Sequence, residues 1–344
     1  MRAAKRQRRA PPEPAAGEPQ FSLLRLLWLV VPAAVAALAF FISTTNPSVS
    51  EVDVQPPPFV VRDIPGKGKG VIATRDIKQG ELLLQESPMF VVPKSITGSP
   101  AAFIWRLLNN VTQADRDATH PEEVALAIFQ TNAVSAADDG VGVFPRMARM
   151  NHGCASAFNA VYSWRKRERQ LFVHALRNIQ RGQELLTTYT ETKRSRHERR
   201  EFLLQRYGFL CTCAVCSLDD ATSKLSDERL TAISHHYDHF ATWGSERISG
   251  VEAVHTINAI WKLEDEEGYW SERGQLAADA AWVSAAHADA AAVRSWSQLA
   301  VKWYTYELGP DSDQVLEAQR TAENPEQHPA WGSRERLTLE LPVD

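Results

Sequence analysis

Short apolar segments begin at Phe59 and are separated by glycine-rich turns. The segments FVVRDI, GVIATRDI and ELLLQESPMFVV have the length and β-branched content of strands. Residues 101–132 change to helical spacing, and Pro121 followed by two glutamates is typical of a helix start. The pattern therefore predicts a domain of short strands that contains a helical insert over residues 95–142.

The chain returns to a strand pattern over residues 143–190, where FNAVYSW and LFVHAL flank a charged turn and ELLTTY follows Gly182. The segment HERREFLLQRYG is amphipathic and predicts a helix that ends at Gly208. Residues 226–310 contain several helical stretches rich in Ala and Trp. Two of them resemble a tetratricopeptide-like pair, although no clean repeat period is present. We therefore expect an α+β fold with an all-α C-terminal region.

These patterns divide the chain into segments of different character. A length of 344 residues suggests about two domains. The predicted segments are 1–20 (basic and Pro-rich), 21–42 (a hydrophobic helix), 43–58 (linker), 59–190 (the β-rich domain), 191–218 (a helix and a cysteine segment), 222–320 (a helical domain) and 321–344 (a tail, loose over 322–334).

The N-terminal segment has the character of a membrane anchor. The run Leu26–Ile42 is uncharged and near the lower limit of about 17–25 residues for a spanning helix. A basic stretch precedes it, and KRQRR fits topogenic charge and a nuclear-import signal equally well. A cleaved signal peptide and a buried core helix are the alternatives. We expect a single-pass protein of the endoplasmic reticulum or nuclear envelope, or a cytoplasmic or nuclear one if this helix does not insert.

The charge balance limits the partners. The formal net charge of −4 argues against a nucleic-acid binder, which is usually basic overall. Two local basic runs, Arg165–Arg169 and Lys193–Arg200, are most typical of a solvated turn and a solvated helix face. The alternative for each run is contact with an acidic peptide or with nucleosomal DNA. We expect a monomer.

The four cysteines of the chain predict a metal site. Three of them form a C-x-C-x-x-C segment, a spacing that places several thiolates within reach of one ion. Structural zinc needs four ligands, and one further cysteine exists, beside the rival ligand His152. Two disulfides or four free thiols are the alternatives, because four cysteines permit three pairings. The predicted Zn²⁺ ligands are Cys154, Cys211, Cys213 and Cys216.

Four segments, in order, resemble the SET-domain protein lysine methyltransferases over residues 59–218. Gly68–Ile77 with Gly80-Glu81 is similar to the opening of the SET domain, and Arg149–Cys154 to its central Asn-His-x-Cys motif. Ala175–Tyr189 is similar to the closing strand and tyrosine, and Tyr207–Cys216 to the cysteine segment that follows. The cysteine spacing and Thr131-Asn132 look most like the SET-and-MYND branch. No cysteines remain for a MYND zinc finger, so fungal SET proteins without that module are the closer comparison.

The resemblance implies a methyl donor, S-adenosylmethionine, and a protein or peptide lysine as substrate, with histones among the candidates. Tyr189 would line the lysine channel and orient the amine and the methyl group. It would not act as a general base, because a phenol with a pKa near 10 is a poor base at neutral pH. Tyr207 and Phe209 would form the aromatic wall, with Phe209 also against the adenine. The alternatives are a core tyrosine that closes a strand and an apolar anchor for the cysteine segment.

The resemblance also implies the residues that hold the cofactor. Asn151 and His152 would contact its amino-acid and adenine parts; without the neighbouring motifs, His152 would be read as a core histidine. Asn132 would reach the cofactor or cap its helix. The turn before the second strand would let the backbone approach the cofactor closely and would offer cationic donors to its carboxylate. The alternative is a simple hairpin turn. The residues of this turn are Lys67, Gly68, Lys69 and Gly70.

One segment departs from the family pattern. Gly153 replaces the usual serine of the central motif, and Ala155–Asn159 replaces x-Pro-Asn with an apparent extra residue. The first alternative is therefore a catalytically silent SET scaffold that binds peptide. The second is a membrane-tethered adaptor in which residues 226–310 carry the function.

Overall fold

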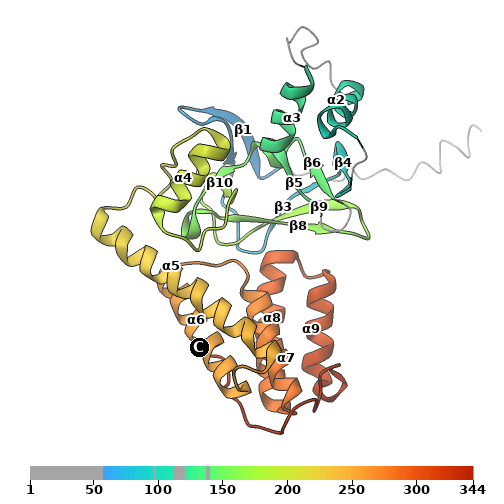
Figure 1. Ribbon diagram of the computed structural model, residues 1–344, viewed down its shortest axis with the longest axis vertical. Coiled ribbons are helices and arrows are strands. Elements are labelled where there is room, and N and C mark those ends of the chain that lie inside the picture. The colour runs from blue at the N-terminus through green and yellow to red at the C-terminus, as the bar shows by residue number, and fades with distance from the viewer. Residues whose placement is uncertain (1–56, 96–97, 112–120, 137–139, 344) are drawn as a thin grey trace, which may run out of the picture. The chain divides into compact units, whose positions relative to one another are not determined.

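Three small sheets form the first half of the part of the chain that the structure describes (Figure 1). The computed structural model describes residues 57–95, 98–111, 121–136 and 140–343. The sheet orders are β1-β2-β10-β7, β3-β9-β8 and β4-β6-β5. The strands are β1 (Phe59–Ile64), β2 (Gly68–Ala73), β3 (Leu82–Glu86), β4 (Phe90–Val92), β5 (Ala133–Ser135), β6 (Val141–Val143), β7 (Asn151–His152), β8 (Ala160–Arg165), β9 (Gln170–Ala175) and β10 (Glu184–Thr187).

The insert expected to be helical over residues 95–142 is only partly so. Helices α2 (Pro100–Val111) and α3 (Pro121–Asn132) form its first part. Strand β6 then pairs with both β4 and β5 in an antiparallel sheet, so the prediction was wrong over 133–135 and 141–142. The cause is long-range: Ala133–Ser135 and Val141–Val143 gain backbone hydrogen bonds through the sheet, which local periodicity does not reveal.

Helices dominate the chain after β10. Ser195 and Glu198 form a capping box at the start of α4 (Arg196–Tyr207), and Gly208 ends it in the left-handed region with φ +74°. This confirms the predicted helix end. The remaining helices are α5 (Asp220–Ala241), α6 (Gly250–Glu267), α7 (Arg273–Ala286), α8 (Ala290–Leu308) and α9 (Asp313–Glu323).

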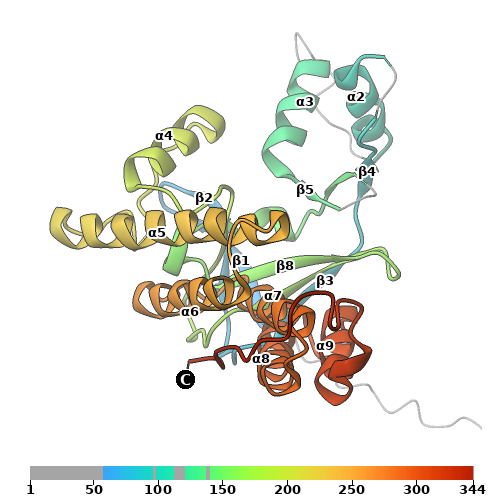
Figure 2. The ribbon, with the colours of Figure 1, turned by 60° about the horizontal axis from the view of Figure 1, so that its bottom comes forward.

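The helical region has its own core of alanines and aromatic side chains. In Figure 2, α5 and α6 lie side by side, and α8 packs against both α7 and α9. At its centre the Arg273 guanidinium is 1% exposed and lies 4.7–4.9 Å from three indole rings. The tetratricopeptide-like repeat remains a prediction.

The C-terminal segment, expected to be loose over 322–334, packs against these helices, with the Gly332 and Arg334 amides donating hydrogen bonds of 3.0 and 2.9 Å to the carbonyl oxygens of Ala285 and Ala286. Leu339 is buried in the core of the helical region. Trp296 Nε1 donates a hydrogen bond of 3.0 Å to the carbonyl oxygen of Glu340, and Asp289 accepts one of 2.8 Å from the Leu339 amide. The tail stays in place because it satisfies these polar groups, which its own composition does not indicate.

Each basic run contains at least one cation that is largely withdrawn from solvent, so the expectation of solvated surfaces holds only in part: Lys166, Arg167 and Arg169 are exposed, whereas Arg165 and Lys193 are not. Arg165 makes two hydrogen bonds of 2.6 and 2.8 Å to the Asp311 carboxylate and one of 2.6 Å to the carbonyl of Leu308. Its guanidinium also stacks 4.0 Å from the Phe172 ring. Lys193 is buried and lies 2.5 Å from a carboxylate oxygen of Glu272. These cations join the β-rich region to the helical region.

The predicted membrane anchor at 21–42 lies outside the described residues. Among the helices that the structure does describe, none is both long and apolar enough to cross a bilayer. The anchor therefore remains a prediction.

Replacing Arg165 with methionine is expected to lower the free energy of unfolding by about 1–3 kcal/mol, because the charge-assisted hydrogen bonds and the ring contact are lost. The Asp311 side chain is 70% exposed and stays hydrated, so no charge is stranded. Urea unfolding measures the change. Arg167→Met in the same turn is the control, because that side chain is 74% exposed, and we expect a change within about 0.5 kcal/mol. Equal losses in both variants would contradict the role given to Arg165.

Candidate functional site

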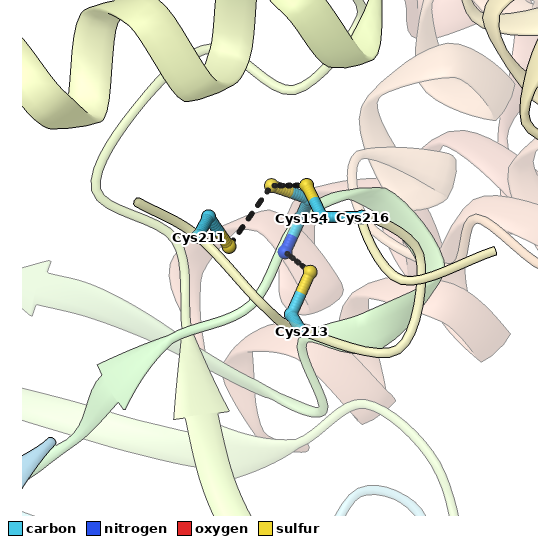
Figure 3. Close-up of side chains that lie close together, drawn as sticks. All are labelled: Cys154, Cys211, Cys213 and Cys216. Carbon is cyan, nitrogen blue, oxygen red and sulfur yellow. Dashed lines mark hydrogen bonds between the residues drawn. The ribbon is translucent and has the colours of Figure 1, made fainter. Parts of the chain in front are cut away.

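All four cysteine sulfurs meet at one buried point (Figure 3). They lie within 4.8 Å of one another, with Cys154 Sγ 3.6 Å from Cys216 Sγ and 4.0 Å from Cys211 Sγ. A tetrahedron of sulfurs at about 2.3 Å from zinc has edges of about 3.8 Å, so these spacings fit that ion. No disulfide joins the four. The fourth ligand predicted from the sequence thus lies beside the other three.

The protein surrounds these thiols with positive charge from α4. Arg200 donates hydrogen bonds of 3.1 and 2.9 Å to the carbonyl oxygens of Cys211 and Cys216. The Arg199 side chain is fully buried, and its Nε and Nη2 have no oxygen or nitrogen partner among the described residues. Burial alone would lower the pKa of Arg199, but interactions with Cys154, Cys216 and Asp227 together outweigh burial and raise that pKa. Two guanidinium groups beside one cluster suit a site that carries net negative charge.

The cysteine cluster is connected to the candidate active site through His152. The Tyr189 amide donates a hydrogen bond of 3.0 Å to Nδ1 of His152, so a neutral ring carries its proton on Nε2. That nitrogen lies 3.0 Å from Cys154 Sγ. Burial lowers the pKa of His152 to about 4, so the ring is neutral at physiological pH. His152 therefore joins the metal-binding cluster to the backbone at Tyr189.

Two cavities lie on either side of a tyrosine pair. The first has a volume of about 300 Å³ and the second about 170 Å³, and Tyr189 and Tyr207 line both. The two rings are 5.2 Å apart. The first cavity is also lined by Gly66, Lys67, Asn151, His152, Phe209, Leu210, Cys211, Thr212 and Cys213. The second is also lined by Thr131, Asn132, Ala133, Val134, Ser135, Met147, Ala148, Met150, Tyr162, Thr187 and Thr188.

The Tyr189 hydroxyl is held in place and stays protonated. It donates a hydrogen bond of 2.7 Å to the carbonyl oxygen of Met150. Burial, with smaller contributions from Tyr207 and Glu184, raises the pKa of Tyr189 to about 12. At neutral pH the phenol can donate or accept hydrogen bonds, but it cannot remove a proton from an ammonium group.

Glu184 holds the wall of the first cavity together, although the sequence did not single it out. One carboxylate oxygen accepts a hydrogen bond of 2.8 Å from Asn151, and the other lies 2.8 Å from Lys67 Nζ. Asn151 also donates to the carbonyl oxygen of Lys69 at 3.1 Å. A Cβ on Gly70 would lie 2.9 Å from both Asn151 Nδ2 and Glu184 Oε1, so only glycine leaves room for this network. Glu184 stands in the segment Gly182-Gln183-Glu184, which belongs to one of the family-like motifs. Its contacts with Asn151 and Lys67 could not be predicted, because these residues lie far away in the sequence.

Of the other residues predicted to hold the cofactor, some line a cavity and others do not. Lys67, in the turn before β2, lines the first cavity, whereas Gly68, Lys69 and Gly70 form the start of β2 and do not line it. The Lys69 side chain instead pairs with Asp63 at 2.7 Å. Asn132 lines the second cavity, and its amide donates to the carbonyl oxygen of Ile128 at 2.8 Å.

The unusual loop after Cys154 preserves the link to β10. Asn159 is buried and makes two hydrogen bonds with β10, one to the carbonyl oxygen of Glu184 at 2.9 Å and one from the Leu186 amide at 2.8 Å. A Cβ on Gly153 would lie only 2.8 Å from the Phe158 nitrogen, so glycine at 153 accommodates this loop. Ala155 turns the chain with φ +41°. The departure from the family pattern therefore leaves Asn151, His152 and Cys154 in place.

Comparison with known proteins gives a consistent result. Residues 68–190 match the family model of the SET domain. The histone-lysine N-methyltransferase set5 of Schizosaccharomyces pombe is 29% identical over 293 residues, which are 82% of this chain and 87% of that protein. Mouse histone-lysine N-methyltransferase SMYD3 is 31% identical over 36% of this chain, but this match spans only 26% of SMYD3.

Solved structures match more remotely. The SET domain of LSMT, solved with lysine and AdoHcy, is 13% identical, with a TM-score of 0.32 over 79% of this chain and 89% of that chain. A likeness this distant adds nothing to the sequence comparisons, which confirm the resemblance carried by the motifs. Residues 68–190 therefore form a SET domain of the kind found in protein-lysine methyltransferases, and the chain is homologous to fungal Set5 and SMYD proteins.

Proposed function

We propose that this protein transfers methyl groups from S-adenosylmethionine to lysine side chains of a protein substrate, with histones as the first class to test. One observation carries this proposal: two cavities share the walls Tyr189 and Tyr207. The larger cavity, with Lys67 and Asn151 in its wall, suits the cofactor's carboxylate and amino groups. The smaller cavity suits the aliphatic stem of a lysine, because Met147, Met150 and Tyr162 line it.

The reaction needs a neutral amine held in line with the methyl group. When bound, S-adenosylmethionine supplies an electrophilic methyl carbon, and displacement by lysine Nζ forms the N–C bond while the C–S bond breaks to give a thioether. None of the described residues that line the smaller cavity is a carboxylate or another charged group. The ammonium form therefore gains no partner there and is disfavoured by desolvation. The proton leaves to water before the transfer, since Tyr189 is no base.

We also propose a structural Zn²⁺ bound by Cys154, Cys211, Cys213 and Cys216. Its support is the close sulfur spacing and the two guanidinium groups of Arg199 and Arg200 around it. Without a cation, the shared hydrogen bonds with the neighbouring thiols and burial raise the pKa of Cys154 far above its ordinary value. Zinc would keep the thiols deprotonated and would hold residues 207–216 against the Asn151-His152 strand.

Replacing Tyr189 with phenylalanine is expected to lower kcat for methyl transfer by about 10²-fold, because the hydroxyl that orients the reacting groups is lost. Radiolabelled methyl incorporation on a histone and peptide panel measures this loss. The Kd for S-adenosylmethionine, from calorimetry, should change less than about threefold. Tyr306→Phe in the helical region is the control. Undiminished kcat in Tyr189→Phe would refute the assigned role.

The pH dependence separates orientation by Tyr189 from proton removal. Below the pKa of the substrate lysine, we expect kcat/KM to rise about tenfold per pH unit, because the neutral amine is the reactive form. Tyr189→Phe should keep the same slope at a lower rate, since the wild-type phenol has a pKa of about 12. A slope that flattens only in the variant would show that the tyrosine takes the proton.

The zinc site predicts a stoichiometry and a thiol count. Purified protein should contain about one zinc per chain, and its four cysteines should react with a thiol reagent only after chelation. Cys216→Ser should lose the metal and most methyl transfer, although Cys216 lines neither of the two cavities. Elemental analysis and the transfer assay check both points. A zinc-free protein with full activity would contradict the site.

The alternative of a silent SET scaffold has its own outcome in these experiments. Failure to bind S-adenosylmethionine would overturn the methyltransferase proposal. Peptide binding without methyl incorporation across the panel would favour the scaffold.

A further inference from the structure

A third cavity lies within the helical region and shares no residue with the two described above. Its volume is about 210 Å³, and helices α7, α8 and α9 form its walls. Its floor contains alanines and Ser297, and its rim is polar and aromatic. The residues that carry the argument are Gln275, Asp279, Trp282, Ser297, Tyr304 and Glu317.

The cavity carries negative charge that the protein does not neutralise. Asp279 and Glu317 line it, and neither forms an ion pair among the described residues. Asp279 accepts one hydrogen bond of 2.8 Å, from Gln275, and burial raises its pKa. No lysine or arginine lines the cavity, and burial lowers the pKa of its one histidine, His328. Asp279 is thus partly removed from water with no cation beside it, so its negative charge is not compensated.

A second, independent feature points to a ligand. Ser297 is 1% exposed, and its hydroxyl has no hydrogen-bond partner among the described residues, although it lies at the floor of this cavity. Buried hydroxyls are nearly always paired, so the Ser297 hydroxyl lacks the partner that such a group normally has. At the rim, the Trp282 indole is 49% exposed and is held edge-on against His328 at 5.0 Å.

We propose that this cavity binds the cationic side chain of a basic peptide, with a lysine or arginine head group between Asp279 and Glu317 and its stem along Trp282. Two carboxylates, an unpaired hydroxyl and a half-exposed indole together suit an organic cation. A metal ion fits less well, because the groups of side chains close enough to hold one comprise only the four cysteines among the described residues. This inference does not depend on methyl transfer.

The test measures binding of a fluorescent alternating Gly-Lys peptide to the full chain by anisotropy. We compare wild type with Asp279→Asn/Glu317→Gln, which removes both charges and keeps the shapes. The matched control is Glu323→Gln/Glu326→Gln, which removes two exposed charges nearby, outside the cavity. Because a lysine peptide could also enter the active-site channel, the difference between the two double variants isolates this cavity.

The cavity variant is expected to bind the peptide about tenfold or more weakly than wild type, and the control within about twofold. The same peptide with acetylated lysines should bind wild type more weakly by a similar factor. Its affinity should be the same for wild type and for Asp279→Asn/Glu317→Gln. Peptides with arginine or trimethyl-lysine then show which cation is preferred, with Trp282→Ala weakening the trimethylated form most. The single variant Glu317→Gln changes an exposed side chain and should fold normally, so weaker binding by this variant cannot be attributed to misfolding. Equal binding by wild type, Glu317→Gln and the cavity double variant would overturn the proposal.

Discussion

The packing of Cys154 against the cysteines of residues 211–216 is the contact on which the rest of the site depends. It joins two segments that are far apart in the sequence, the loop after β7 and the loop after α4. Both segments are short on regular structure, with one 3-10 turn over Ala155–Ala157, so this contact is a main determinant of their relative position. The core around the sulfurs also includes Leu203, Leu230 and Tyr269, which brings α4, α5 and the end of α6 to the same point.

From this point a short series of hydrogen bonds reaches the two cavities. Cys154 contacts His152, His152 accepts from the Tyr189 amide, and the Tyr189 hydroxyl donates to Met150. On the other side, Phe209 lies between α4 and the cysteines, with its ring 6.4 Å from that of His152. The cysteine cluster therefore helps to position both Tyr189 and the aromatic wall formed by Tyr207 and Phe209. A structural metal in this place would act on catalysis through geometry alone.

The sequence was sufficient for residues that belong to contiguous motifs and insufficient for those that act through distant partners. Asn151, His152 and Tyr189 could be singled out because they stand in short segments with a fixed order, and all three line the first cavity. Glu184 and Arg199 could not, because the contribution of each depends on contacts with groups elsewhere in the chain, which no local pattern encodes. The same reason explains why β5 and β6 were taken for part of a helical insert.

The helical region is better understood as part of the folding unit than as an appendage. Arg165, Lys193 and Arg199 are largely buried cations of the first 218 residues, and each finds its carboxylate beyond them, in Asp311, Glu272 and Asp227. A chain that ended after the cysteine segment would lose all three ion pairs and would expose the side chains that the helices cover. These three cations therefore tie the SET domain to the helices that follow it.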